Sequence, residues 1–310
     1  MKSALVLCRT PFQASLIEKI LREENIDLFD LVYYTQQDST EDRHYFGILA
    51  ARARSSVYIY RPPRRYSILS YFELYLGSLN YLRDRRPAIV VLASFDNHIF
   101  NSIASRQKDA KLVTFDDGTA NIFSQGTYFY TDRGWRTQLY RRAFGAVDPD
   151  LLKWRVSTHY TVFENYRNIV PAHKVKTIRR NNRLRPSELG KPLVFFIGGP
   201  FHESCSDDEL HRLSEYIGTC GIDYYVTHPR ETVPIYSEAK FLNKNGMLAE
   251  DAILQASEHV KPIVISHAST VLFNLGAQDA RKVMVLFEGN PQTEEISRLA
   301  QQSGCEIVLI

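Results

Sequence analysis

The chain has 310 residues, 44% hydrophobic and 24% charged, with a formal net charge of +3 at pH 7, which is ordinary for a folded soluble protein. No apolar run reaches the ~20 residues that a membrane span needs, and the run before Arg9 is too short for a signal peptide. Four scattered cysteines without a CxxC pair indicate reduced cytosolic thiols and argue against a structural zinc site. The length suits two domains of about 150 residues each.

The first half alternates short apolar segments, rich in β-branched and aromatic residues, with longer segments of helical periodicity. The expected strands are Ala4–Cys8, Leu31–Thr35, Val57–Tyr60, Ala88–Ala93 and Lys111–Phe115. The expected helices are Pro11–Glu24, Ser67–Arg83 and Asn97–Lys108. This alternation predicts a parallel sheet with helices on both faces.

The middle of the chain is basic: residues 133–185 hold thirteen arginines and lysines against three acids. Such a segment is either a solvated surface or a contact for an anionic partner, such as a membrane, an acidic glycolipid or a nucleic acid. It includes an apolar stripe at helical spacing, flanked by arginines. The stripe is Trp135, Leu139, Tyr140, Ala143, Phe144 and Val147. This helix is expected either to pack on the core or a partner subunit, or to lie on an anionic membrane.

The second half repeats the alternation. Its expected strands are Pro192–Ile197, Asp223–Thr227, Pro262–Ser266, Lys282–Phe287 and Glu306–Leu309. Its expected helices are Asp207–Ile217, Glu250–Ser257, Thr270–Ala277 and Thr293–Gln302. The pattern predicts an α/β protein of two Rossmann-like, doubly wound domains, 1–170 and 192–310, which face a central cleft. A polar, basic linker over 171–191 is expected to join them.

Candidate phosphate-binding residues follow two strands of the second half. His228 comes after Asp223–Thr227 and precedes Pro229 and Arg230. Its imidazole can hydrogen-bond a nucleotide phosphate or protonate it, or it can simply satisfy backbone groups. Ser269 and Thr270 open a helix after another strand, where hydroxyls serve as caps and can also hold an anion.

The loop Gly198-Gly199-Pro200 follows the strand Pro192–Ile197 and lets backbone approach a ligand closely. The next acids, in Ser206-Asp207-Asp208-Glu209, are explained by a capping box and a helix dipole. Glu203 has no such structural role, so it is the first candidate for a general base in this loop.

Asp116 and Asp117, followed by Gly118, compete with Glu203 for that role. Paired carboxylates at the end of Lys111–Phe115 can activate a hydroxyl or bind it, although they can also serve only to cap a turn. No group of acids, histidines and cysteines makes a persuasive divalent-metal site.

Taken together, these motifs resemble the bacterial lipooligosaccharide sialyltransferases of glycosyltransferase family 52. The matching segments are Thr10-Pro11-Phe12-Gln13, Thr114–Asn121, His159–Phe163, Gly198-Gly199-Pro200, Thr227–Thr232, Glu250-Asp251 and Ser269-Thr270. They extend over nearly the whole chain, and FDDGT and HPR are the most specific of them.

The resemblance implies a GT-B-type fold and an inverting, metal-independent transfer of sialic acid from CMP-sialic acid to a terminal galactose of a lipid-linked glycan. We further expect no cofactor and no nucleic-acid partner, a location at the cytoplasmic face of the inner membrane, and a peripheral membrane contact through the basic residues 133–185. A homodimer is a further option. The alternatives are a transferase of similar fold with another nucleotide donor (glucosyl- or glycerophosphotransferase), or a non-catalytic nucleotide- or glycan-binding protein.

The resemblance also assigns roles to residues. His228, with Pro229 and Arg230, would engage the CMP phosphate, which Ser269 and Thr270 would also hold. Glu250 would place the cytidine or its ribose, and Glu203 fits the family's base best. Asp116 and Asp117 stay open as the base, because related families use an acid-acid-Gly turn. Gln13 and Gly118 are expected on the acceptor side.

Overall fold

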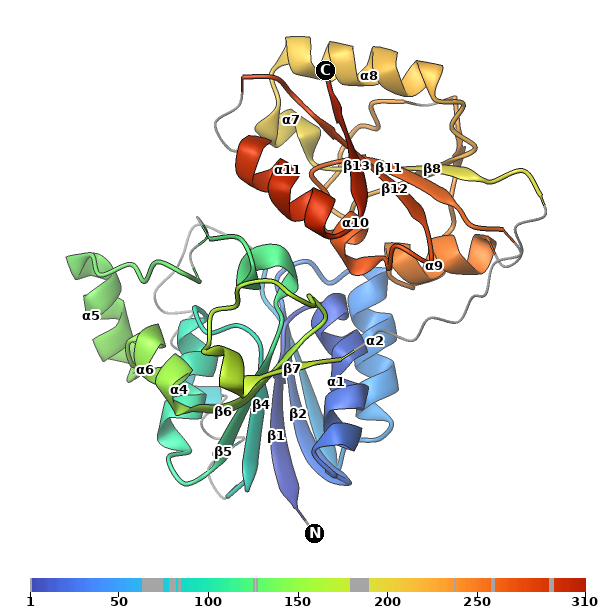
Figure 1. Ribbon diagram of the computed structural model, residues 1–310. Coiled ribbons are helices and arrows are strands. Elements are labelled where there is room, and N and C mark those ends of the chain that lie inside the picture. The colour runs from blue at the N-terminus through green and yellow to red at the C-terminus, as the bar shows by residue number, and fades with distance from the viewer. Residues whose placement is uncertain are drawn as a thin grey trace. The chain divides into compact units, whose positions relative to one another are not determined.

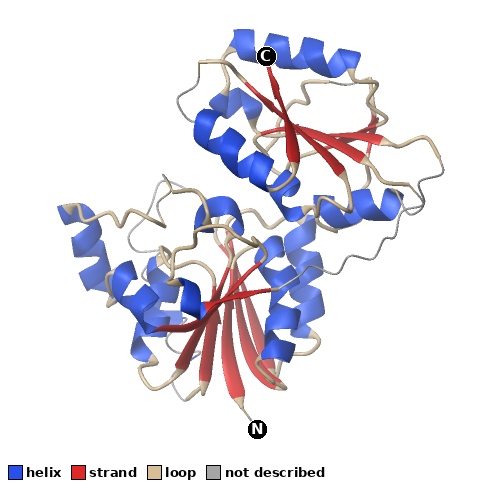
Figure 2. Cartoon of the chain, viewed as in Figure 1, coloured by secondary structure: helices blue, strands red, loops and turns tan. Residues whose placement is uncertain are grey.

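The computed structural model describes residues 2–62, 75–77, 82, 85–124, 126, 128–178, 190–236, 238–257, 260–289 and 293–310. The chain divides into two compact units, Met1–Arg180 and Asn181–Ile310. Each unit is built on a parallel sheet flanked by helices (Figures 1 and 2).

Unit 1 contains a seven-stranded sheet in the order β3-β2-β1-β4-β5-β6-β7, and every neighbouring pair is parallel. Its strands are β1 (Ser3–Cys8), β2 (Leu28–Thr35), β3 (Ser55–Tyr60), β4 (Ile89–Leu92), β5 (Lys111–Phe115), β6 (Val156–Thr161) and β7 (Val175–Thr177). Its helices are α1 (Pro11–Glu23), α2 (Thr40–Ala50), α4 (His98–Arg106), α5 (Trp135–Phe144) and α6 (Pro149–Arg155), with 3-10 turns η1 (Gly118–Asn121) and η2 (Ala172–Lys174).

Helix α1 illustrates how local sequence places the site. Thr10 caps the helix by accepting from the backbone N–H of Gln13, and Pro11 occupies the first turn, where its missing N–H is not needed. Leu16 and Ile20 are buried on the face that packs on the sheet. The helix therefore starts at a fixed point just after β1, with Gln13 in its first turn.

Several elements of unit 1 differ from the expectation, among them helix α6, which was not predicted. Helix α2 and strand β6 were not predicted, and β7 falls inside the expected linker 171–191. The sheet of unit 1 thus extends beyond residue 170, because β7 pairs with β6. Most of the expected helix Ser67–Arg83, and the rest of the linker up to residue 189, lie outside the described residues.

Unit 2 contains a six-stranded parallel sheet in the order β10-β9-β8-β11-β12-β13. Its strands are β8 (Val194–Ile197), β9 (Tyr224–Val226), β10 (Lys240–Phe241), β11 (Ile263–His267), β12 (Arg281–Leu286) and β13 (Cys305–Leu309). Its helices are α7 (Phe201–Ser204), α8 (Asp207–Thr219), α9 (Ala249–Ala256), α10 (Thr270–Asn274) and α11 (Thr293–Gln302).

Most predicted elements of unit 2 are present. The capping box at the start of α8 is formed as expected, with Ser206 and Glu209 bonding each other's backbone. Two differences affect the site: α7 occupies part of the loop expected after Pro200, and α10 ends at Asn274 rather than at Ala277.

Both sheets reverse their strand order at the first strand, next to β4 in unit 1 and next to β11 in unit 2. Ligands of open α/β sheets bind beyond the carboxyl ends of the strands at such a point. The expected fold of two Rossmann-like, doubly wound units is confirmed, and the cleft expected between them stays a prediction. Within the described ranges, no helix is long and apolar enough to cross a bilayer.

Candidate functional site

Asp117 lies just after β5, partly exposed and surrounded by hydrogen-bond donors. Gln13 Nε2 donates to its Oδ1 at 2.6 Å. Ser94 Oγ and the Tyr128 hydroxyl donate to its Oδ2 at 2.9 and 2.7 Å. Burial raises the pKa of Tyr128 well above its ordinary value, so the phenol stays a donor. Three neutral donors thus fix the orientation of the Asp117 carboxylate.

Asp116, the other acid of the pair, is 0% exposed. Its Oδ2 accepts from Thr161 Oγ1 at 2.8 Å and from the backbone N–H of Val162 at 2.7 Å. Its Oδ1 lies 3.2 Å from His159 Nε2. The carboxylate thus joins β5 to β6 inside the unit. These contacts argue against Asp116 as the base and leave Asp117 as the acid of this turn that can meet a substrate.

The two expected acceptor-side residues lie beside Asp117. Gln13 is 0% exposed, so its amide reaches Asp117 and Ser94 but not solvent. Gly118 begins the turn η1 with a φ of +62°, a conformation that favours glycine. Gln13 therefore holds the site together, and Gly118 makes the turn that carries the carboxylate.

His228 lies two residues beyond β9, half-buried. The backbone N–H of Arg230 donates to its Nδ1 at 3.1 Å. This bond assigns Nδ1 as the acceptor, so the neutral ring carries its proton on Nε2. The backbone N–H of His228 donates to Glu231 Oε2 at 3.1 Å. Ring and backbone are both held at the carboxyl edge of the sheet.

Glu203 does not lie in a loop, as the sequence suggested, but on the short helix α7. Its Oε2 lies 3.3 Å from Arg230 Nη1, and both side chains are more than half exposed. Exposed pairs of this kind contribute at most about 1 kcal/mol. The ion pair places Glu203 next to the corner formed by His228, Pro229 and Arg230, which we call the HPR corner.

Ser269 follows β11 and caps α10, accepting from the backbone N–H of Val271 at 3.3 Å. The preceding residue, Ala268, has a φ of +48°, which is strained for a residue with a Cβ. Helix α10 ends at Asn274 after little more than one turn. An anion here would therefore be held by the hydroxyls of Ser269 and Thr270 rather than by a helix dipole.

Glu250 lies in the first turn of α9 and is 4% exposed. Its Oε1 accepts from Asn274 Nδ2 at 2.6 Å, which links α9 to α10. The loop Gly198-Gly199-Pro200 follows β8, the strand between β9 and β11. The sheet thus brings this loop, the HPR corner and Ser269 to one edge of unit 2.

Several residues of this site were not predicted. Ser94 and Tyr128 around Asp117 carry no local motif, and Glu231 was seen only as part of the segment Thr227–Thr232. Lys244 adds a cation that donates to the carbonyl of Thr227 at 3.2 Å. Across the described ranges, no group of three His, Cys, Asp or Glu residues could hold a metal ion.

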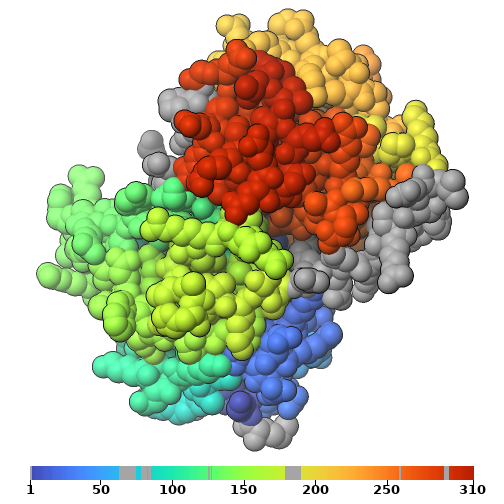
Figure 3. Space-filling model, in the orientation of Figure 1, coloured from blue at the N-terminus to red at the C-terminus, as the bar shows by residue number. Residues whose placement is uncertain are grey.

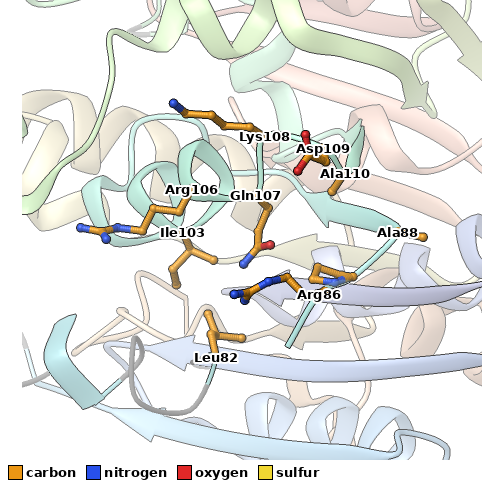
Figure 4. Close-up of a pocket in the computed structure, with 10 residues that line it drawn as sticks. Leu82, Arg86, Ala88, Ile103, Arg106, Gln107, Lys108, Asp109 and Ala110 are labelled. Carbon is orange, nitrogen blue, oxygen red and sulfur yellow. The ribbon is translucent and has the colours of Figure 1, made fainter. Parts of the chain in front are cut away.

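A cavity of about 670 Å³ lies elsewhere in unit 1, at the amino ends of β4 and β5 (Figure 4). Its lining includes Arg86, Ile103, Arg106 and Lys108 and none of the predicted site residues. It lies at the opposite end of the sheet from Asp117. Because open α/β sheets bind ligands beyond the carboxyl ends of their strands, the cavity is not part of the candidate site.

Helices α5 and α6 expose a set of apolar side chains. Trp135 is 73% exposed and Leu139 61%, whereas Phe144 is buried. On α6, Leu151 is 59% and Trp154 83% exposed. Figures 1 and 3 show α5 at the outer edge of unit 1. The expected stripe therefore packs on the core only near the end of α5.

Cations lie over both exposed indoles. The Arg136 guanidinium is 5.3 Å from the ring centre of Trp135, and Lys174 Nζ is 6.0 Å from that of Trp154. Such pairs are the cation–π contacts of a basic, aromatic surface. We call Trp135, Arg136, Leu139, Leu151 and Trp154 the aromatic-basic surface.

Known proteins match both the fold and the sequence. The crystal structure of an alpha/beta-galactoside alpha-2,3-sialyltransferase from Photobacterium phosphoreum has a TM-score of 0.52 at 13% identity and covers 100% of this chain and 98% of that one. At this identity the likeness concerns the fold alone, the GT-B-type pairing of Rossmann-like units.

Two relatives are named N-acetyllactosaminide alpha-2,3-sialyltransferase. The protein from Haemophilus influenzae is 24% identical over 273 residues, 87% of this chain and 88% of the relative. The protein from Neisseria meningitidis is 24% identical over 267 residues, 81% of this chain and 68% of the relative. A model of the glycosyltransferase family 52 matches residues 29–287, most of both units. The chain therefore belongs to glycosyltransferase family 52.

Proposed function

We propose that the protein is a sialyltransferase that moves sialic acid from CMP-sialic acid to a terminal galactose of lipooligosaccharide or a related glycan. The observation that carries the proposal is the HPR corner at the carboxyl edge of unit 2, in a chain of family 52. Its relatives from Haemophilus and Neisseria match most of the chain, and their name, N-acetyllactosaminide alpha-2,3-sialyltransferase, supports the transfer of sialic acid.

The leaving group is a nucleoside monophosphate, and the residues of unit 2 suit a single phosphate. The Nε2–H of His228 donates to a phosphate oxygen, or the protonated ring supplies a proton as the glycosidic bond breaks. Arg230 adds positive charge, and the hydroxyls of Ser269 and Thr270 complete the contacts. These groups can stabilise the departing charge of CMP, so the proposed reaction uses no metal and no cofactor.

The rest of the donor is assigned to the same edge of unit 2. The backbone of Gly198, Gly199 and Pro200 would line the nucleotide, together with Pro229. Glu250 is buried against Asn274, so it would support the cytidine or ribose by holding α9 and α10 together.

Asp117 is our proposed general base. An inverting displacement needs its base and its leaving group on opposite faces of the sugar. Glu203 pairs with Arg230 of the phosphate-binding corner, which suits the leaving-group side. Asp117 is partly exposed and oriented by three donors, so it can take the proton of the galactose hydroxyl.

The acceptor is a glycolipid in this proposal, so the enzyme would work at the cytoplasmic face of the inner membrane. The aromatic-basic surface supports a peripheral contact there. Exposed indoles insert at the headgroup level of a bilayer, and adjacent cations attract anionic lipids. A homodimer is compatible with this arrangement, and a nucleic-acid partner is not part of it.

The decisive experiment is a transfer assay with CMP-sialic acid and lactose, in parallel with thermal shifts in CMP, UDP and CDP. We expect sialyllactose and CMP as products, and stabilisation by CMP alone. Stabilisation by UDP or CDP instead would favour a glucosyl- or glycerophosphotransferase. CMP binding with no turnover on any galactoside would favour a non-catalytic binding protein.

A further inference from the structure

Glu231 directly follows the HPR corner in the chain, and its carboxylate bonds the backbone of that corner. Its Oε2 accepts from the backbone N–H of His228 at 3.1 Å, and its Oε1 accepts from the Tyr225 hydroxyl. The backbone of Gly199 lies close to the carboxylate and lowers its pKa. One side chain thus bonds His228 beyond β9 and Tyr225 within β9, and lies against the loop after β8.

Gly198 makes room for this carboxylate. A Cβ at position 198 would lie 2.3 Å from Glu231 Oε2 and 2.7 Å from Oε1. Contacts this short do not occur in proteins, so any side chain at 198 would expel the carboxylate. The first glycine of the loop is therefore required by Glu231, whatever its second role toward a ligand.

The partners of Glu231 are all donors, which calls for an ionised carboxylate. Burial raises the pKa of Glu231, while the hydrogen bonds from Tyr225 and His228 and the nearby backbone of Gly199 oppose that rise. A half-buried carboxylate is costly to keep in place unless such bonds are made. Tyr225 is itself fully buried, so the anchor is rigid.

We propose that Glu231 is a positioning residue for His228: its carboxylate ties the HPR corner to the Gly198-Gly199 loop and keeps the imidazole oriented toward the donor phosphate. The inference rests on the proposed function for the identity of that phosphate. The link to the ring is indirect. Glu231 fixes the His228 backbone, and the corner then keeps the Arg230 N–H on Nδ1, which leaves the proton on Nε2.

The first test is Glu231→Gln, which keeps the shape but turns an N–H₂ group toward other donors. We expect kcat/KM for CMP-sialic acid to fall at least about tenfold, the scale of a lost hydrogen bond to a charged group, with the KM for lactose unchanged. Glu215→Gln on α8, an exposed acid, is the matched control and should leave both constants unchanged. Circular dichroism and the melting temperature verify that each variant folds.

The second test is a double-mutant cycle with Gly198→Ala. In the wild-type background this change should cost as much kcat/KM as the loss of Glu231, because it expels the carboxylate. In a Glu231→Ala background the same change should cost little, because the space is vacant. Gly218→Ala on α8, where a Cβ would meet nothing within 4 Å, is the control. Additive losses would overturn the proposed coupling.

The third test needs no substrate. Nitrogen-15 spectra of the His228 imidazole in the ligand-free protein should show the Nε2–H tautomer, and Glu231→Gln should change that signature. If the wild type does not turn over CMP-sialic acid, the proposed function fails, yet the spectra still decide the role of Glu231. Unchanged spectra together with unchanged kinetics in Glu231→Gln would overturn the inference.

Discussion

Gln13 Nε2 lies 2.6 Å from Asp117 Oδ1, although 104 residues separate the two in the sequence. The other end of the same amide accepts the backbone N–H of Arg9 at 2.8 Å. Since Gln13 is buried and both ends of its amide are bonded, it cannot also bind a sugar. Of Gln13 and Asp117, only Asp117 is partly exposed, so it is the one that a substrate could reach.

Asp117→Asn should lower kcat for transfer by about 10²–10⁴-fold, the usual contribution of a general base. CMP affinity should stay within a factor of a few, because Asp117 belongs to unit 1 and the phosphate-binding groups to unit 2. Steady-state kinetics and CMP calorimetry measure the two effects. Glu203→Gln is the comparison: if it abolishes transfer while Asp117→Asn does not, the base is Glu203.

Gln13→Ala should lower kcat by about tenfold while leaving the KM for CMP-sialic acid unchanged. The reason is that Ser94 and Tyr128 still hold Oδ2 of Asp117 while Oδ1 loses its donor. Gln37→Ala, in the loop after β2, serves as a control of the same residue type. A raised KM for lactose with normal kcat would instead indicate that residue 13 contacts the acceptor.

His228→Ala should reduce turnover at least about 10²-fold with folding intact. His228→Gln is the informative companion, because an amide N–H₂ can replace a neutral imidazole donor but cannot supply a proton. Recovery of most activity in His228→Gln would identify the imidazole as a hydrogen-bond donor. Equal losses in both variants would identify it as an acid, and near-normal activity in His228→Ala would remove it from catalysis.

Stability should fall in mild acid, partly because of His267. Its Nδ1–H donates to the Val285 carbonyl at 2.8 Å, and its ring packs against Phe201 and Phe287. Burial lowers the pKa of His267 below its ordinary 6.5, so the unfolded chain takes up the proton first. Its contribution to stability is complete above about pH 6.5 and is lost as the pH falls below that value.

Urea unfolding at about pH 7.5 and about pH 5.5 measures this dependence. His267→Asn keeps a donor but does not titrate, so the free energy of unfolding should change less between the two pH values. The exposed His211 of α8 provides the control variant, His211→Asn, which should behave like the wild type. An unchanged pH dependence in His267→Asn would contradict the assignment.

The aromatic-basic surface should bind anionic vesicles. Trp135→Ser combined with Arg136→Glu should reduce co-sedimentation with phosphatidylglycerol vesicles several-fold, because both the inserted indole and a cation are lost. Transfer to soluble lactose should be unaffected, which separates binding from catalysis. Equal sedimentation of variant and wild type would reject the membrane contact and favour a partner protein on this surface.

Sequence patterns predicted the elements with apolar periodicity and missed those without it. Helix α2 buries Glu41 and Asp42 beside Tyr45 and Leu49. Its buried face is therefore partly acidic and leaves no apolar stripe. Strand β6 reads Val-Ser-Thr-His-Tyr-Thr, yet most of it is buried, because partners such as Asp116 satisfy its polar groups. Only the folded neighbours of these residues explain their burial.

The residues of the candidate site, like the elements of the fold, could be predicted only where a sequence pattern marks them. Motifs that follow strands marked Asp117, His228 and Ser269, because parallel sheets place such residues at one edge. Ser94 could not be found, since its contact with Asp117 depends on the pairing of β4 with β5. Tyr128 lies 11 residues beyond Asp117 in a segment without a recognisable motif. The wrong expectation of a loop around Glu203 arose because a four-residue helix leaves no periodic pattern.

The contact of Arg230 with Glu203 has one more consequence. The Arg230 guanidinium is exposed and makes only a weak ion pair with Glu203. An arriving phosphate would therefore displace the Glu203 carboxylate at little energetic cost. Glu203 would then act as a stand-in anion, occupying Arg230 until a nucleotide arrives and discouraging unrelated anions of low charge. Replacing Glu203 by a neutral residue should lower the protein's selectivity among small phosphates more than it lowers the rate of transfer.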